Sequence, residues 1–115
     1  VLSNTTIARP DTLRSNRSGE VGGLSGKPLR EPSTAQTKRI YKMTEGKLPL
    51  IGVGGIMSGA DAYARIGAGA SLLQLYTGFV YHGPTLIPHV LNELKMLLER
   101  DGFKNIQDAV GHAVK

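Results

Sequence analysis

The sequence contains no cysteine and no tryptophan, and its aromatic residues are limited to four tyrosines and two phenylalanines. Without cysteine, a disulfide scaffold and a thiolate metal site are both excluded. His82, His89 and His112 share no metal-ligand spacing, so no zinc or iron site is expected. No apolar run approaches the roughly 20 residues that cross a membrane. No leader peptide is visible either, although an incomplete chain could not show one.

The chain carries a formal net charge of +5 and has a pI of about 9.8. Such a balance is compatible with a nucleic-acid or membrane-surface partner. The lysines and arginines are scattered, however, and are not interleaved with aromatic residues. A solvated basic face explains them better, and no nucleic-acid partner is expected.

The stretch from Leu50 to Gly59 combines an apolar run, a glycine cluster and the start of a helical pattern at Ser58. This order predicts a buried strand that ends at a tight turn against a helix, with Ser58 and Asp61 as its cap. The helix should contain the small residues up to Ile66 and end at Gly67 and Gly69. Glycines at such a turn let backbone N–H groups approach an anion.

A second apolar run, from Ser71 to Tyr76, ends at Thr77-Gly78. It is predicted to be a parallel strand buried on both faces, completing a right-handed βαβ unit. Two consecutive strand ends rich in glycine suggest the phosphate site of a (β/α)₈ barrel. Its donors would be the backbone N–H of Gly55 and of Thr77 or Gly78, with the Thr77 hydroxyl as an addition.

Other nucleotide-binding motifs do not fit. No Walker-type glycine loop ending in Lys-Ser or Lys-Thr is present. In the G-x-G-x-x-G fingerprint the third glycine after Gly52 and Gly54 would fall at Met57. No Ser-His-Asp order is convincing.

The N-terminal residues allow two interpretations. Val1 to Ser3 has the pattern of a strand end, which would place Asn4 and Thr5 at the ligand face of a barrel; an ordinary turn fits equally well. The long, glycine-rich segment from Arg9 to Leu29 is either a binding loop or a flexible surface loop. Within it, residues 22–26 could bring the backbone close to a flat ligand.

Helices are predicted on both sides of the βαβ unit. Ser33 and Gln36 form a possible capping box for a first helix, with Gln36, Ile40 and Met43 on its inner face and Gly46 at its end. Residues 77–84 read as a short helix or turn. Thr85 is predicted to cap a long amphipathic helix that ends at Gly102, and Asn105 to cap a last short one.

The chain has 115 residues, whereas a complete barrel of this type needs roughly 250 residues. The barrel interpretation therefore predicts that this chain, which starts at Val1 rather than Met, is part of a longer protein. A small complete α/β domain is the alternative.

Four motifs occur in order along the chain: Asn4-Thr5-Thr6-Ile7-Ala8-Arg9-Pro10, Gly22-Gly23-Leu24-Ser25-Gly26-Lys27-Pro28-Leu29, Ile51-Gly52-Val53-Gly54-Gly55-Ile56 and Gln74-Leu75-Tyr76-Thr77. Together they resemble the dihydroorotate dehydrogenase family. The Gly-Leu-Ser-Gly-Lys-Pro-Leu run is similar to the class 2, quinone-linked, membrane-associated members.

The resemblance implies an α/β fold: residues 1–115 would be the C-terminal part of one FMN-binding (β/α)₈ TIM barrel, about the last three strands with their helices. It implies FMN-dependent oxidation of dihydroorotate to orotate in pyrimidine (UMP) biosynthesis. In that reaction a base removes a proton from C5, a hydride moves from C6 to flavin N5, and ubiquinone reoxidises the flavin.

Site residues also follow from the resemblance. Asn4 and Thr5 correspond to orotate-binding positions. The FMN-binding positions are Ser3, Ser25, Gly26, Gly54, Gly55, Tyr76, Thr77 and Gly78. The catalytic serine base is expected upstream of Val1, so no catalytic residue is assigned within this chain.

The quinone site and the membrane-docking helices are likewise expected upstream. The implied location is the mitochondrial inner membrane in a eukaryote or the cytoplasmic membrane in a bacterium. The isolated 115 residues are predicted to be inactive, with exposed sheet edges and apolar helix faces. An inactive truncated product and another FMN- or phosphate-binding barrel enzyme are the alternatives.

Overall fold

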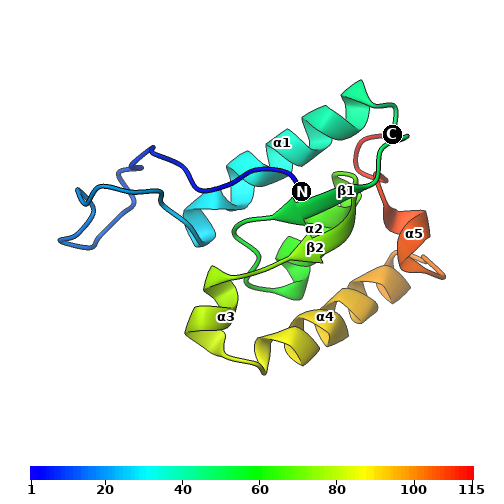
Figure 1. Cartoon of the computed structure of the whole chain (residues 1–115). Helices are drawn as coiled ribbons and strands as arrows, with labels where there is room; N and C mark the ends of the chain where they lie inside the picture. The colour runs from blue at the N-terminus through cyan, green and yellow to red at the C-terminus, as the bar shows by residue number, and fades with distance from the viewer.

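The computed structural model describes all 115 residues, from Val1 to Lys115. It is an α/β arrangement of two strands, five α-helices and one 3₁₀ turn (Figure 1). The elements in chain order are η1 (Lys27–Leu29), α1 (Arg30–Met43), β1 (Leu50–Val53), α2 (Gly59–Gly67), β2 (Ala70–Gln74), α3 (Thr77–His82), α4 (Leu86–Arg100) and α5 (Ile106–Ala109).

The sheet consists of β1 and β2, which pair in parallel with Gly52 opposite Leu73 and Val53 opposite Gln74. Leu2 adds an isolated parallel bridge to Gly52, and its N–H donates to the Ile51 carbonyl at 3.0 Å. Residues 1–3, expected to be the end of a strand, form only this single bridge, on the edge of β1 that does not pair with β2. Both strands end toward the same edge, as the βαβ prediction required.

A layer of helices covers one face of this sheet. α1 packs against β1, and α2 packs against β2 and lies between α1 and α4 (Figure 1). The apolar core lies between α2, β2 and α4, where Ala62, Leu86 and Val90 are buried together with Ile56. The molecule measures only 20 Å along its shortest axis, which is the thickness of two layers.

The prediction for the second strand is wrong in two respects. The strand spans Ala70–Gln74, because Tyr76 has φ −133° and ψ −66°, which is not extended. It is also not buried on both faces, since Leu72 remains 64 % exposed. The reason is physical: the helices of this chain cover one face of the sheet, and nothing in it covers the other.

The predicted start of the first helix is also wrong. Lys27–Leu29 forms a 3₁₀ turn that runs directly into α1, so the helix begins at Arg30 and Ser33 lies within it. Ser33 is buried rather than capping, and its Oγ lies 3.3 Å from the Ser3 Oγ. The face of α1 that packs against β1 and α2 carries Ser33 and Thr37, whereas Gln36 and Met43 are exposed.

The remaining helix predictions are largely confirmed. The Ser58 side chain accepts the Asp61 N–H at 3.1 Å at the start of α2, and Asn105 Oδ1 accepts the Asp108 N–H at 3.1 Å at the start of α5. α3 and α4 occupy their predicted ranges. Thr85 does precede α4, but its side chain makes no cap; its hydroxyl donates to the His82 carbonyl at 3.2 Å.

Candidate functional site

The two strand ends border one pocket of about 300 Å³ at the carboxyl edge of the sheet. We call it the strand-end pocket. All ten residues that the sequence analysis assigned to ligands line it: Ser3, Asn4, Thr5, Ser25, Gly26, Gly54, Gly55, Tyr76, Thr77 and Gly78. Six further residues complete the lining: Val1, Leu29, Val53, Ile56, Gln74 and Leu75.

The wall after β1 is formed by the turn of Gly54 and Gly55. These residues have φ values of 99° and 75°, which favour glycine. A Cβ on Gly55 would lie 2.4 Å from the backbone nitrogen of Arg30, so a side chain cannot enter without displacing the start of α1. Neither glycine N–H donates to a backbone carbonyl of the chain. The turn therefore offers two free donors at the pocket.

The wall after β2 is formed by Thr77 and Gly78. They open α3, so their N–H groups have no intrahelical partner, and neither donates to a backbone carbonyl elsewhere. Gly78 fits closely, because a Cβ there would lie 2.6 Å from the carbonyl oxygen of Ile56. Tyr76, in contrast, is 78 % exposed, with no aromatic partner.

The glycine-rich loop closes one side of the pocket. The Thr77 hydroxyl donates to Ser25 Oγ at 3.0 Å, which joins the loop to α3. Gly26 has φ 84°, and a Cβ there would lie 2.9 Å from Thr77 Cγ2. Of residues 22–26, Ser25 and Gly26 thus border the pocket, and the role of the loop in binding a ligand stays a prediction.

Asn4 and Thr5 lie at the open rim. Asn4 Oδ1 accepts the Thr5 N–H at 2.8 Å, which directs the amide NH₂ of Asn4 away from that contact. Thr5 packs on the loop, because a Cβ on Gly23 would lie 1.9 Å from Thr5 Oγ1. Amide and hydroxyl groups are thus held next to the glycine-rich loop.

Ser3 has φ 70°, a left-handed conformation that is uncommon for a residue other than glycine. Its hydroxyl donates to the Val53 carbonyl at 3.2 Å. Ser3 therefore lines the pocket while its hydroxyl ties the N-terminal segment to the end of β1.

Arg65, which belongs to none of the sequence motifs above, lies directly behind the Gly54–Gly55 turn. Its side chain is 1 % exposed, and its guanidinium donates to the carbonyls of Val53 and Gly54, both at 2.8 Å. Burial lowers the pKa of Arg65, with an opposing effect of the Asp61 carboxylate. The helical spacing of Ala62, Arg65 and Ile66 is the signal that could have placed this arginine on the buried face of α2.

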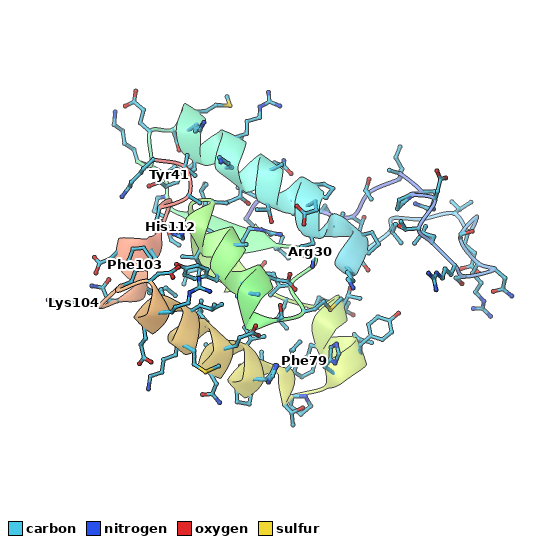
Figure 2. All side chains as sticks on the ribbon, turned by 180° about the vertical axis from the view of Figure 1, so that it is seen from behind. Arg30, Tyr41, Phe79, Phe103, Lys104 and His112 are labelled. Carbon is cyan, nitrogen blue, oxygen red and sulfur yellow. The ribbon has the colours of Figure 1, made fainter.

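Arg30 and Asp61 mark the outer side of the same turn. Arg30 Nη1 lies 3.3 Å from Asp61 Oδ1, and Asp61 Oδ2 accepts the Met57 N–H at 3.0 Å. Figure 2 places Arg30 at the first turn of α1 and Tyr41 near the other end of that helix, beside the C-terminal segment. The Arg30–Asp61 ion pair therefore joins α1 to α2 beside the turn, whereas Arg65 lies behind the turn without a carboxylate hydrogen-bonded to it.

Comparison with known proteins identifies the family. The sequence profile described as dihydroorotate dehydrogenase matches residues 1–98. This chain belongs to the dihydroorotate dehydrogenase family.

Members of the family resemble the chain over nearly its whole length. It is 52% identical over 115 residues to dihydroorotate dehydrogenase (quinone) from Azorhizobium caulinodans, and 56% identical over 112 residues to the mitochondrial protein of that name from Arabidopsis thaliana. These matches cover 100% and 96% of this chain, but only 32% and 24% of the two relatives. The chain thus spans about a third of the bacterial relative and about a quarter of the plant one.

Solved structures agree with the sequence match. The ligand-free enzyme from Eimeria tenella superimposes with a TM-score of 0.97 at 46% identity, covering 100% of this chain and 32% of that one. The complex of the Eimeria tenella enzyme with ferulenol gives a TM-score of 0.92 at 48% identity, covering 96% and 29%. The arrangement of strands and helices described above is therefore that of a segment of a dihydroorotate dehydrogenase.

No helix of this segment combines the length and the apolar character needed to cross a membrane.

Proposed function

We propose that this chain supplies the FMN-phosphate site and part of the orotate site of a quinone-dependent dihydroorotate dehydrogenase in pyrimidine biosynthesis. One observation carries the proposal: the ten ligand-binding positions implied by the family motifs line a single pocket at the strand ends. The chain is about half identical to relatives named dihydroorotate dehydrogenase (quinone), which supports the same activity.

The residues present fit FMN. Four backbone N–H groups, from Gly54, Gly55, Thr77 and Gly78, donate to no carbonyl and border one pocket, as binding of a phosphate requires. The close contacts around Gly26 and Gly55 leave the backbone as the only surface that a ligand can approach there. When bound, FMN supplies the acceptor for the hydride of dihydroorotate.

Within this proposal, the Gly54–Gly55 turn and residues 77–78 hold the phosphate. Ser3, Ser25, Gly26 and Tyr76 border the remainder of the cofactor. Asn4 and Thr5 bind and orient the substrate through amide and hydroxyl groups. The base that removes the C5 proton belongs to another part of the protein.

The same proposal makes residues 1–115 the C-terminal part of a single (β/α)₈ barrel domain. The chain spans about a third of the length of its bacterial relative, and one face of its sheet is open. Exposed apolar side chains such as Leu72 and Leu91 lie where further strands and helices would pack. The quinone site and membrane attachment would also lie in the preceding part, at the mitochondrial inner membrane in a eukaryote or the cytoplasmic membrane in a bacterium.

The full-length protein tests this function. We expect it to be purified with bound flavin and to oxidise dihydroorotate with a ubiquinone analogue as acceptor. A folded, colourless protein without this activity, even after incubation with FMN, would contradict the proposal. Residues 1–115 alone should show no turnover, because the base is absent.

A further inference from the structure

Arg65 reaches the Gly54–Gly55 turn through a gap that a glycine leaves in β1. A Cβ on Gly52 would lie 2.6 Å from Arg65 Cγ and 2.9 Å from its Cδ. The aliphatic part of the arginine therefore crosses the strand where Gly52 has no side chain. Any larger residue at position 52 would displace it.

The guanidinium joins α2 to two other segments. It donates to Val53 and Gly54 at the end of β1, and its Nε donates to Thr34 Oγ1 at 3.1 Å and its Nη2 to the Arg30 carbonyl at 3.3 Å in α1. All of its partners are neutral. Asp61, the acidic neighbour that affects its pKa, is instead bonded to Arg30 and to the Met57 N–H.

The two short bonds determine the direction of the glycine N–H groups. A trans peptide is planar, so its C=O and N–H point in opposite directions. Arg65 holds the carbonyls of Val53 and Gly54, and the N–H groups of the same two peptides belong to Gly54 and Gly55. Those N–H groups therefore point away from Arg65, on the side of the turn that borders the pocket.

The positive charge adds a second effect. A charged donor polarises the peptide to which it binds, which strengthens the N–H on the other side as a donor. A buried cation without a carboxylate partner is also costly, and an anion bound nearby lowers that cost. The Ser3 hydroxyl also donates to the Val53 carbonyl, at 3.2 Å, but among side chains only Arg65 donates to the Gly54 carbonyl and only Arg65 brings a charge to both peptides.

We propose that Arg65 is a positioning residue that orients and polarises the Gly54–Gly55 turn for the phosphate of the flavin nucleotide. It acts through the backbone and does not touch the ligand. This inference rests on the proposed function, because it assumes that the turn binds the FMN phosphate.

The test compares FMN with riboflavin, which has the same ring system but no phosphate. Both affinities are measured by flavin fluorescence quenching on the full-length apoprotein. In Arg65→Met, the FMN affinity should fall about tenfold or more, because two charge-assisted hydrogen bonds no longer hold the turn. The riboflavin affinity should stay within about twofold, and Arg65→Lys should restore most of the FMN affinity.

Two further variants keep the result interpretable. Thr34→Ala removes the partly exposed acceptor of Nε and should lower the FMN affinity about twofold to threefold, which decides the matter if Arg65→Met does not fold. Arg39→Met removes an equal charge from an exposed position on α1 and should change neither affinity.

The outcomes separate the two proposals. A wild-type protein that binds riboflavin as tightly as FMN contradicts the phosphate site itself. A wild-type protein that prefers FMN, combined with an Arg65→Met variant that keeps this preference, overturns only the role of Arg65. An equal loss of both affinities in the variant, with no rescue by lysine, would show that Arg65 is merely structural.

Discussion

Arg65 and Arg9 use the same chemistry in two different surroundings. Each guanidinium donates to several backbone carbonyls; those of Arg9 belong to Thr6, Ala8, Ser18, Glu20 and Gly22. Arg9 is exposed at the base of the long loop, whereas Arg65 is buried behind the glycine turn. Water can replace Arg9 at its exposed carbonyls, whereas the carbonyls held by Arg65 belong to half-buried residues, Val53 and Gly54, and their donor is itself buried. Burial, rather than the number of hydrogen bonds, should therefore decide which arginine matters more.

The glycines of the two regions also differ in their surroundings: Gly55 of the turn is closely packed, whereas Gly19 of the loop has open space around it. The largest effect of a substitution is expected at Gly55. Gly55→Val should abolish detectable FMN retention by the full-length protein, because its Cβ would overlap the backbone of Arg30 at a φ of 75°. Bound flavin is measured by absorbance after gel filtration.

Gly19→Ala is the matched control in the loop. No atom lies within 4 Å of a Cβ at that position, so flavin retention should equal that of the wild type. Equal retention in Gly55→Val and wild type would contradict the close fit of the turn.

The two arginines can be compared directly by their effect on stability. Arg65→Met should lower the free energy of unfolding of the full-length protein by about 3 kcal/mol, because two charge-assisted hydrogen bonds are lost. The Gly54 carbonyl is then left without a partner, and the Val53 carbonyl keeps only the Ser3 hydroxyl. Arg9→Met should lower it by less than about 1 kcal/mol, because exposed interactions contribute little. Denaturant titration followed by circular dichroism measures both, and equal losses would show that burial does not separate them.

The sequence predicted the elements that local rules determine. The caps at Ser58 and Asn105 and the glycine turn after β1 follow from residue type and spacing alone. The resemblance then brought ten residues together, and all line the strand-end pocket. Their roles toward ligands stay predictions.

What failed depended on tertiary context. The burial of β2 on both faces requires a layer that this chain does not supply. The start of α1 depends on the 3₁₀ turn at Lys27–Leu29, and its inner face depends on how the helix packs against β1 and α2. The role of Arg65 depends on carbonyls from two other segments, which no local pattern reveals.

A smaller effect is expected at the link between the loop and α3. Thr77→Val removes the hydroxyl that binds Ser25 but keeps the backbone N–H. The FMN affinity of the full-length protein should fall about threefold to tenfold, in line with the loss of one hydrogen bond. Ser25→Ala is the comparison, because it removes only the loop partner and should have the milder effect. An unchanged FMN affinity in Thr77→Val would show that the Thr77 hydroxyl does not contribute to FMN binding.

The smallest effect concerns the Tyr63–Asp101 pair, which joins α2 to the residue that follows α4. Hydrogen bonds from Arg100 and Tyr63 lower the pKa of Asp101 to about 2, and burial followed by the Asp101 contact raises the pKa of Tyr63 to about 12. Because the pKa of Asp101 is lower in the folded protein, its ionised carboxylate stabilises the fold above about pH 4, and this stabilisation is lost as the pH falls toward 2. Because the pKa of Tyr63 is higher in the folded protein, its protonated hydroxyl stabilises the fold below about pH 10, and this stabilisation is lost as the pH rises toward 12.

Urea unfolding of the full-length wild type and of Asp101→Asn between pH 2 and 7 checks the acid side. The difference between the two proteins should shrink as the pH falls below about 4. A difference that is constant over this range would contradict the pairing.

If the strand-end pocket holds the phosphate of FMN, the protein must distinguish FMN from riboflavin, which lacks the phosphate. The dissociation constants of FMN and riboflavin are measured on the full-length wild-type apoprotein under identical conditions. We expect FMN to bind at least about a hundredfold more tightly, because four backbone N–H groups meet its phosphate. Equal affinities for the two flavins would contradict it.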